Sequence, residues 1–397
     1  MFNQLQGVPP DALLKLIVQF GQDSNPKKVD LGVGVYKDEQ GNTPVMQAVT
    51  AAEHIILEQQ KTKSYIGPAG SPLYCELSAE LLFGKNHSVI KDRRISVAQT
   101  PGGCGALRMA AEFINVCKPG ATVWVSTPTW VNHIPLMCEA GLQLKEYPYY
   151  NDETKDVDFD KMLEALETAN EGDIVLLHGC CHNPSGADLN QAQWQQVAEL
   201  ILRKHLLPFI DIAYQGLGDG LNEDAHGLRL MADTVPEMIV ASSCSKNFGL
   251  YRERTGTVVV ISSDATRAAI SGSQLFSTIR GHYSMPPAHG AAIVETILSQ
   301  SELNTQWVDE LSVMRNRLAD NRAAIASALK AVGTDRDFSF ITAEKGMFSF
   351  LGITPAQVDQ LREEHAIYMA GSSRINIAGI STANVEYVAH AISQVIK

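Results

Sequence analysis

The sequence predicts an α/β protein with a large domain built on a mainly parallel sheet and a second, smaller α/β domain. Between residues 95 and 261, short apolar runs alternate with segments whose apolar residues have helical spacing. This alternation indicates parallel strands joined by helices that cover both faces of one sheet. After about Ser301 the pattern changes to a long amphipathic helical region followed by shorter strands and helices, which indicates a separate unit.

Length and composition set further limits. A chain of 397 residues is expected to form two or three domains, and a hydrophobic content of 45% is ample for a sizeable core. We expect an N-terminal arm over residues 1–10, a small domain from 11–42 and 313–397, and a large domain over 43–312. The net charge of −12 argues against nucleic acid or an anionic membrane as the main partner, because both require a basic surface.

Cysteine usage and the N-terminus indicate a cytoplasmic protein. The seven cysteines are an odd number without Cys-x-x-Cys spacing, and two of them, Cys180 and Cys181, are adjacent. We therefore expect reduced thiols and no metal site. The first residues lack the pattern of a signal peptide, and no apolar run is long enough to span a membrane.

The large domain should contain seven strands and their connecting helices. The expected strands are Ile95–Gln99, Val123–Ser126, Gln143–Tyr147, Ile174–His178, Pro208–Ile212, Met238–Ala241 and Thr257–Ile261. Helices are expected from Thr43 to about residue 60 and over 72–83, 102–116, 131–140, 157–170 and 191–204. Two of them have a strong start signal, Thr43-Pro44 and Ser71-Pro72, in which a capping hydroxyl precedes a proline at the first helical position.

The remaining segments belong to the arm and the small domain. Pro9-Pro10 gives residues 1–10 an extended character, which fits either an arm lying on a partner subunit or a frayed terminus. The small domain should contain helices over 11–20, from 301 to 330, over 355–365 and from about 384. Its expected strands are Leu31–Val35, Phe338–Ile341, Met347–Leu351 and Arg374–Ala378.

Chemically useful residues follow five of the predicted strands. Because ligands bind beyond the carboxyl ends of the strands in open α/β sheets, these residues should share one edge. In chain order they are Gly102-Gly103-Cys104, Trp130, His182-Asn183-Pro184, Asp211 with Tyr214, and Ser243 with Lys246. Together they offer a glycine-rich helix start, an indole, an amide, a carboxylate, a phenol and an amine.

Lys246 is the candidate nucleophile. It follows a buried strand and is flanked by hydroxyl-bearing residues, an environment that suits a Schiff-base lysine, whose amine must be partly desolvated. Ser243, Ser245 and Arg254 would then serve as donors to a phosphate. The alternative is a polar loop with a solvated lysine.

The other residues also have structural alternatives. Gly102-Gly103 fits either a phosphate cradle at a helix N-terminus or a simple tight turn. Asn183-Pro184 is also an ordinary turn signal, and packing is the alternative role for Tyr214 and Trp130. Asp211 is harder to explain structurally, because a carboxylate at the end of an apolar strand needs a partner; a protonated ring nitrogen is one candidate.

In combination, these residues closely resemble the aspartate and aromatic amino acid aminotransferases, class I pyridoxal-phosphate enzymes of fold type I. The resemblance covers nearly the whole chain. It rests on Leu31-Gly-Val-Gly-Val-Tyr-Lys, Gly102-Gly103, Cys181-His-Asn-Pro-Ser-Gly-Ala-Asp188, Asp211-Ile-Ala-Tyr214-Gln-Gly, Ser243-Cys-Ser-Lys246-Asn-Phe, Tyr251-x-Glu-Arg254-x-Gly, Tyr283-Ser-x-Pro-Pro and Arg374. It implies a homodimer with shared active sites, amino acids and 2-oxo acids as small-molecule substrates, and pyridoxal 5′-phosphate as cofactor.

The resemblance also implies a role for each residue. The catalytic group would be Lys246, Asp211, Tyr214 and Trp130. Lys246 would hold the coenzyme and shuttle a proton, Asp211 would pair with the ring nitrogen, and Trp130 would cover the ring. The cofactor-binding group would add Asn183, Gly103, Cys104, Ser243, Ser245, Arg254 and, from the neighbouring subunit, Tyr65. The substrate-binding group would be Gly34, Trp130, Asn183, Arg374, Arg280, Met285 and Ser64, with Arg280 reaching across the dimer.

Departures from the family pattern concern the substrate range. Cys104 replaces a hydroxyl residue, and Ser64 and Met285 replace asparagines of strict aspartate enzymes, whereas Lys37 and Thr43 remain aspartate-like. We therefore expect an aminotransferase that moves the amino group of phenylalanine, tyrosine, tryptophan and aspartate to 2-oxoglutarate. The alternatives are a strict aspartate aminotransferase and, more remotely, a β-lyase, a decarboxylase or a non-catalytic coenzyme-binding regulator.

Overall fold

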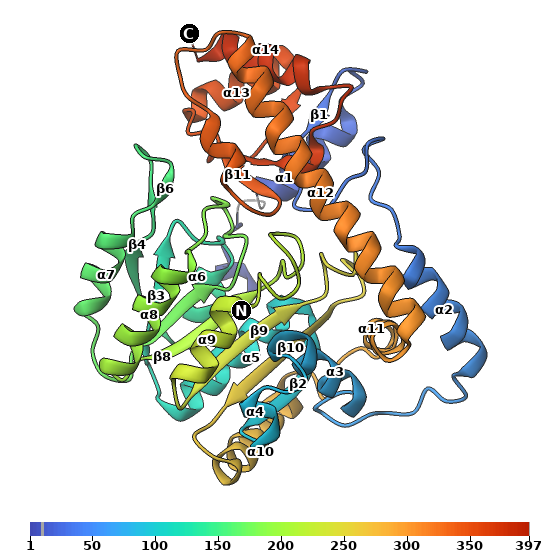
Figure 1. Cartoon of the computed structure of the whole chain (residues 1–397), viewed down its shortest axis with the longest axis vertical. Coiled ribbons are helices and arrows are strands. Elements are labelled where there is room, and N and C mark those ends of the chain that lie inside the picture. Colours follow the sequence, from blue (N-terminus) through green and yellow to red (C-terminus); the bar gives the residue numbers. More distant parts are fainter. Residues whose placement is uncertain (9–11, 397) are drawn as a thin grey trace. The chain divides into compact units, whose positions relative to one another are not determined.

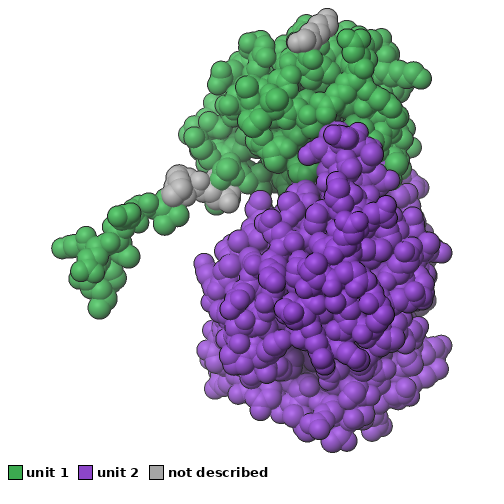
Figure 2. Space-filling view, turned by 90° about the vertical axis from the view of Figure 1, so that its left-hand side faces the viewer, with its two compact units in different colours: residues 1–42, 317–343, 347–397 green, residues 43–316, 344–346 purple. Residues whose placement is uncertain are grey.

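The computed structural model describes residues 1–8 and 12–396. Internal contacts divide the chain into two compact units, which Figure 2 shows in different colours. Unit 1 comprises residues 1–42, 317–343 and 347–397, and unit 2 comprises residues 43–316 and 344–346. Residues 9–11, which include part of the expected arm and the start of its following helix, lie outside the described residues.

Unit 2 contains a seven-stranded sheet (Figure 1). In spatial order its strands are β2 (Ile95–Pro101), β10 (Thr255–Ile261), β9 (Met238–Ser243), β8 (Leu207–Ile212), β7 (Ile174–His178), β3 (Thr122–Thr127) and β4 (Gln143–Pro148). Most of these strands carry apolar residues on both faces and are buried on both, as expected for strands covered by helices on each side. The predicted mainly parallel sheet is confirmed.

Strand direction determines which residues meet at the functional edge. The strands β9, β8, β7, β3 and β4 are parallel, whereas β10 is antiparallel to both β9 and β2. Consequently β2 runs in the same direction as β9, and the carboxyl ends of β2, β3, β7, β8 and β9 lie at one edge. Since β10 runs the opposite way, its first residues, just after Arg254, lie at that same edge.

Helices flank the sheet in Figure 1. In unit 2 they are α2 (Gln47–Gln59), α3 (Pro72–Phe83), α4 (Ser88–Lys91), α5 (Gly102–Cys117), α6 (His133–Cys138), α7 (Phe159–Glu167), α8 (Gln191–Arg203), α9 (His226–Thr234), α10 (Ala265–His282) and α11 (His289–Ser299). Two short strands, β5 (Tyr150–Asn151) and β6 (Asp156–Val157), form a separate ribbon. Helix α5 packs on β9 and β10, and its residues Leu107, Ala110 and Ile114 share a buried apolar cluster with Val258 and Ala241.

Two predicted helix starts have different outcomes. Helix α3 begins at Pro72 as predicted, and the Ser71 side chain accepts a hydrogen bond from the backbone of Tyr74. The prediction that a helix starts at Thr43-Pro44 is wrong, because α2 begins at Gln47. Its free amides are capped by a distant carboxylate instead: Glu310 accepts hydrogen bonds from the backbone nitrogens of Gln47 at 2.6 Å and Ala48 at 3.0 Å.

Unit 1 is a smaller α/β assembly. Its helices are α1 (Ala12–Gln22), α13 (Pro355–His365) and α14 (Val385–Val395), with short 3-10 turns at Phe2–Gln4, Ser339–Thr342 and Ile377–Gly379. Strand β1 (Val29–Asp30) pairs in parallel with β12 (Ile367–Tyr368), and β11 (Phe348–Phe350) pairs antiparallel with β13 (Arg374–Asn376). Helix α12 (Ser301–Ala331) contributes its first 16 residues, 301–316, to unit 2 and residues 317–331 to unit 1.

Two strands predicted for the small domain are wrong. No strand covers Leu31–Val35, because Asp30 Oδ1 accepts hydrogen bonds from the backbone nitrogens of Gly32 and Val33 and turns the chain away. The segment Phe338–Ile341 largely forms a 3-10 turn, which starts where the Asp337 carboxylate accepts the backbone N–H of Ser339 at 2.8 Å. Among the described residues, no helix is both long and apolar enough to cross a bilayer.

Candidate active site

Lys246 and Tyr214 lie together at the functional edge of the sheet. Lys246 follows β9 by three residues and is half-buried, and its Nζ atom lies 5.1 Å from the centroid of the Tyr214 ring. The Tyr214 side chain comes from the loop after β8, and its hydroxyl oxygen lies 3.5 Å from the Nδ2 atom of Asn183. Three different strand ends thus bring an amine, a phenol and an amide into one neighbourhood.

A cradle for an anion lies at the N-terminus of α5. Gly102 has a φ of +72°, and a Cβ atom at this position would fall 2.6 Å from Nη2 of Arg254. A Cβ atom on Gly103 would fall 3.0 Å from Cβ of Ser243. Because glycine occupies both positions, the Arg254 guanidinium and the Ser243 side chain approach the backbone amides of the helix start closely, which is the chemistry that a phosphate requires.

Cys104 and Ser245 complete this region. Cys104 is the third residue of α5, and its thiol lies 3.5 Å from Nδ2 of Asn132. The backbone nitrogen of Ser245 donates to Ser243 Oγ at 3.2 Å, which fixes the turn after β9. A 16-residue helix that starts at glycines, with an arginine and several hydroxyl groups nearby, fits a doubly charged phosphate ester.

Asp211 ends β8 and has a buried imidazole partner. The Nε2 atom of His133, which is fully buried, lies 3.1 Å from Asp211 Oδ2. Burial by itself would raise the pKa of Asp211. The hydrogen bond from His133, with smaller electrostatic contributions from His133, His178 and Lys246, outweighs burial and holds the pKa below its ordinary value. Asp211 is therefore an anion that can pair with a protonated ring nitrogen.

A chain of hydrogen bonds continues behind His133. Thr129 Oγ1 lies 2.8 Å from His133 Nδ1 and 3.1 Å from His178 Nε2, and the backbone nitrogen of Asn183 donates to His178 Nδ1 at 3.4 Å. Burial lowers the pKa of His178 to about 3, so this ring is neutral. One set of proton positions satisfies every link: Asn183 N–H to His178, His178 to Thr129, Thr129 to His133, and His133 to Asp211.

The two ends of this chain, Asn183 and Asp211, were predicted from the sequence, but Thr129, His133 and His178 between them were not. His178 ends an apolar strand, so the same reasoning about strand ends that singled out Asp211 could have found it. His133 and Thr129 lie on a short helix and the loop before it, where the sequence carries no comparable signal. Trp130, which was predicted, packs edge-on against His133 with ring centroids 5.4 Å apart.

Arg374 and Gly34 lie together in unit 1. The Arg374 guanidinium sits 4.2 Å from the centroid of the Phe348 ring, and its Nη2 atom donates to the carbonyl of Gly32 at 3.0 Å. A Cβ atom on Gly34 would fall 2.9 Å from Phe348, so glycine lets the ring that supports Arg374 approach the backbone. The guanidinium is thereby oriented by one aromatic face and one carbonyl.

Four predicted residues lie at or near the surface of unit 2. Tyr65 is 92% exposed, and Ser64 beside it is exposed and lies 2.8 Å from Thr62 through the two hydroxyl oxygens. Arg280, in the last turn of α10, is exposed and donates to the Ser284 hydroxyl. Met285 is half-buried.

Comparison with known proteins places this geometry in a family. The family described as aminotransferase class I and II matches residues 26–392. An aspartate aminotransferase of Salmonella typhi is 48% identical over 396 residues, and an aromatic-amino-acid aminotransferase of Paracoccus denitrificans is 46% identical over 397; both alignments cover 100% of each chain. The crystal structure of an aromatic-amino-acid aminotransferase from Burkholderia pseudomallei, covalently bound to pyridoxal phosphate, has a TM-score of 0.98 at 44% identity over 100% of both chains.

The chain therefore belongs to the class I and II aminotransferases, and it is a pyridoxal-phosphate-dependent transaminase. The predicted family, fold class, enzyme class and cofactor are confirmed. The donor set of unit 2 fits this coenzyme, since an amine, an ionised carboxylate, a phenol and an anion cradle lie at one edge of the sheet.

Proposed function

We propose that the protein transfers the amino group of aspartate and of the aromatic amino acids phenylalanine, tyrosine and tryptophan to 2-oxoglutarate. The two substrates would react in turn, each in its own half-reaction on the same coenzyme. The observation that carries the proposal is the position of Lys246 beside Tyr214 and Asn183, together with an ionised Asp211. A transamination needs a proton carrier and a buried anion, and this edge supplies both.

Pyridoxal phosphate, when bound, supplies an electron sink that stabilises negative charge at the substrate Cα atom. Asp211 would hold a proton on the ring nitrogen, and His133 would keep the carboxylate ionised and oriented. Tyr214 and Asn183 would hydrogen-bond the ring oxygen. Arg254, Ser243, Ser245 and the amides of Gly103 and Cys104 would bind the phosphate, and Trp130 would shield the ring from water.

Lys246 would hold the coenzyme in the resting enzyme and then act as a general base and acid. When its amine is free, Lys246 would take the proton from the substrate Cα atom as a base and release it again as an acid. The Tyr214 ring face beside Nζ offers a cation–π contact that steadies the amine in its protonated state. Such positioned proton transfer contributes roughly 10²–10⁴-fold to the rate.

Arg374 would bind the α-carboxylate of the substrate with its two-pronged guanidinium. Its support by Phe348 and by the Gly32 carbonyl keeps the group oriented before substrate arrives, and Gly34 makes that support possible. Asn183 would assist at the same carboxylate. Arg280 would bind the distal carboxylate of aspartate or 2-oxoglutarate, with Met285 and Ser64 close to the substrate side chain.

We further propose that the protein is a homodimer in which each subunit completes its partner's site. Tyr65 is 92% exposed, and Arg280 also reaches solvent, although both have assigned roles in binding anionic groups. The exposed apolar residues Val45 and Leu57, on and near α2, provide surface that a second copy of the chain would cover.

The test is a half-reaction with a single substrate. Purified holoenzyme receives aspartate or phenylalanine without any 2-oxo acid, and the coenzyme absorbance is followed. We expect each amino acid to change the coenzyme absorbance from that of the aldehyde form to that of the amine form. Added 2-oxoglutarate should restore the first absorbance and release glutamate. Pyruvate or carbon dioxide as the product would indicate a lyase or a decarboxylase, and a response to aspartate alone would indicate a strict aspartate enzyme.

A further inference from the structure

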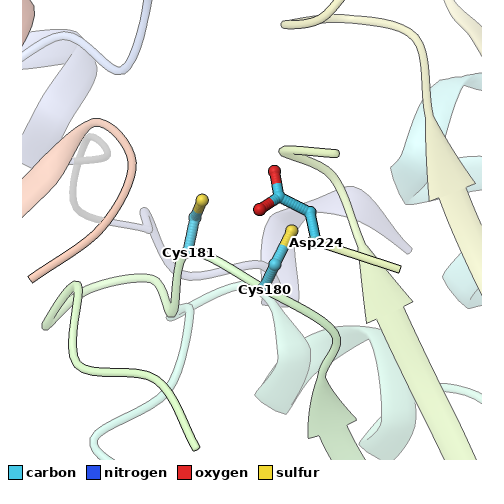
Figure 3. A group of neighbouring side chains, drawn as sticks. All are labelled: Cys180, Cys181 and Asp224. Carbon is cyan, nitrogen blue, oxygen red and sulfur yellow. The ribbon is translucent and has the colours of Figure 1, made fainter. Parts of the chain in front are cut away.

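The loop after β7 places two adjacent thiols and a carboxylate close together (Figure 3). Cys180 and Cys181 are 7% and 2% exposed, Asp224 is 6% exposed, and their ligand atoms all lie within 4.8 Å of one another. In extended backbone, neighbouring side chains point to opposite sides. Here Cys181 has a φ of +51°, and Figure 3 shows both sulfur atoms on the same side of the loop, toward Asp224.

This arrangement is held by the surrounding backbone. Asp188 accepts hydrogen bonds from the backbone nitrogens of Cys181 at 2.7 Å and His182 at 2.8 Å, which fix the turn between the thiols and the coenzyme loop. Gly346 packs against the second thiol, because a Cβ atom there would fall 2.8 Å from Cys181 Sγ. The two thiols are therefore presented as a preformed pair.

The charge around the pair is negative and lacks side-chain compensation. Asp224 is buried and Asp188 is partly buried, and within residues 1–8 and 12–396 neither carboxylate has a lysine, arginine or histidine nitrogen within 4.0 Å. Asp224 Oδ2 accepts two short hydrogen bonds, from the backbone nitrogens of Gly216 and Gly218. Its Oδ1 atom accepts one short bond, at 2.8 Å, and one long bond, at 3.4 Å, and so retains capacity to bind another group.

We propose that Cys180, Cys181 and Asp224 form a binding site for a thiophilic divalent cation of the Zn²⁺ and Cd²⁺ type. The two sulfur atoms are the principal ligands, and Asp224 Oδ1 is the third. Zinc–sulfur bonds are about 2.3 Å long, so donor atoms already within 4.8 Å of one another reach one ion by side-chain adjustment.

Charge balance selects a divalent ion. When the ion binds, two sulfur–hydrogen bonds break, two sulfur–metal bonds form, and two protons leave to solvent, so the net charge of the region does not change. A monovalent ion bound in the same way would add one negative charge beside Asp188 and Asp224, which is unfavourable in a buried region. Oxidation is not involved, and no other reactant is required.

The site lies next to the proposed coenzyme loop but outside it. Asn183 follows Cys181 by two residues, so an ion that links the thiols to Asp224 would fasten the start of that loop to the segment after β8. This site carries no recognisable sequence signal, because adjacent cysteines lack zinc-type spacing and Asp224 is more than 40 residues away.

Cadmium binding to reduced holoenzyme tests the proposal. The protein carries Cys117→Ser and Cys138→Ser, which remove the two exposed thiols, and is freed of metal with a chelator. Equilibrium dialysis and the sulfur-to-cadmium absorption in the ultraviolet are then followed against added Cd²⁺. We expect one Cd²⁺ per chain with two protons released, and a loss of affinity of at least about tenfold in Cys180→Ser and in Cys181→Ser.

Cys75→Ser is the matched control, since Cys75 is another buried thiol in unit 2, outside this loop, and its replacement should leave cadmium binding unchanged. The absence of cadmium uptake, or undiminished uptake and absorption in Cys181→Ser, would overturn the proposal. Should either serine variant fail to fold, proton release decides: fewer than one proton per bound ion excludes a two-thiolate site. Metal uptake is measured without substrate, so its outcome is independent of the proposed transamination.

Discussion

The Nε2 atom of His133 lies 3.1 Å from Oδ2 of Asp211, and the imidazole is fully buried. Through Thr129 and His178 the same chain of hydrogen bonds reaches the backbone of Asn183. One network therefore joins Asp211, the proposed partner of the coenzyme ring nitrogen, to the loop of Asn183, a proposed partner of the ring oxygen. In the one arrangement of protons that satisfies every hydrogen bond of this network, His133 donates to Asp211.

Replacing His133 by asparagine should weaken coenzyme binding. Asp211 would lose its charge-assisted hydrogen bond, and its pKa would rise because burial is then less opposed. Hydrogen bonds to charged groups contribute about 1.5–3 kcal/mol, so the dissociation constant of the coenzyme should rise roughly 10–100-fold. Equilibrium dialysis measures it. His390→Asn, at an exposed histidine of unit 1, is the control, and equal affinity in both variants would remove His133 from this role.

Acid should destabilise the protein through His178. Its pKa is about 3 in the folded protein and 6.5 when unfolded, a depressed folded value, so the neutral ring is favoured by folding. The associated stability is complete above pH 6.5 and is lost as pH falls toward 3, by at most about 1.4 kcal/mol per pH unit. In His178→Gln, the decline of the unfolding midpoint between pH 6.5 and 4.5 should be shallower.

Comparing the two proteins at each pH isolates this contribution. Asp188 acts in the opposite direction, since burial raises its pKa to about 6 and its stabilising contribution, complete below 3.8, is lost as pH rises through 6. That contribution is common to wild type and His178→Gln, so it cancels in the difference. Parallel pH profiles for the two proteins would contradict the expected neutral state of His178.

Borohydride should fix the coenzyme to Lys246. Reduction of the holoenzyme followed by peptide mapping is expected to place the adduct on this residue, because its amine is half-buried at the functional edge beside Tyr214. Lys246→Ala should lose at least about a hundredfold in kcat, as expected for removal of a positioned proton carrier. Lys145→Ala, which removes an amine beside Trp124, serves as the control. An adduct on another lysine rules out the assignment.

Mixed dimers test the shared site. Lys246→Ala and Arg280→Asp subunits are each expected to be inactive toward aspartate. If Arg280 acts on the partner's site, one site of each mixed dimer carries both lesions and the other carries neither. Subunit exchange should then restore aspartate activity to about half of the sites in the mixed dimers. If Arg280 acts within its own subunit, every site keeps one lesion, and demonstrated exchange without recovery would count against the proposal.

The sequence predicted those parts of the structure that depend on strand order and periodicity. Apolar runs located β7, β8 and β9 in the sequence. Because the carboxyl ends of parallel strands share one edge of the sheet, Asp211 and Lys246 could be predicted to lie at the same edge. Contacts distant in sequence were not accessible in this way. The caps of α2 come from Glu310, more than 260 residues later, and the partner of Asp211 comes from a short helix without a clear pattern.

Met285 should favour aromatic substrates over aspartate. The half-buried thioether offers a flexible, polarizable surface to a ring, whereas asparagine offers hydrogen bonds to a carboxylate. One such apolar contact changes the discrimination between aromatic substrates and aspartate by about 1–3 kcal/mol, or roughly 10–200-fold in kcat/KM. That amount admits phenylalanine and tyrosine without excluding aspartate, and the aspartate-like Lys37 and Thr43 argue against a purely aromatic enzyme.

The measurement is kcat/KM for aspartate, phenylalanine and tyrosine with 2-oxoglutarate as acceptor. In the wild type we expect both aromatic values within about a thousandfold of the aspartate value, since a larger gap exceeds what one contact explains. Met285→Asn should lower the aromatic values by roughly tenfold or more while aspartate changes less. Met285→Leu, which keeps an apolar side chain of similar volume, is the control and should retain the aromatic activity. Equal losses on both substrate classes in Met285→Asn would show that residue 285 does not discriminate between them.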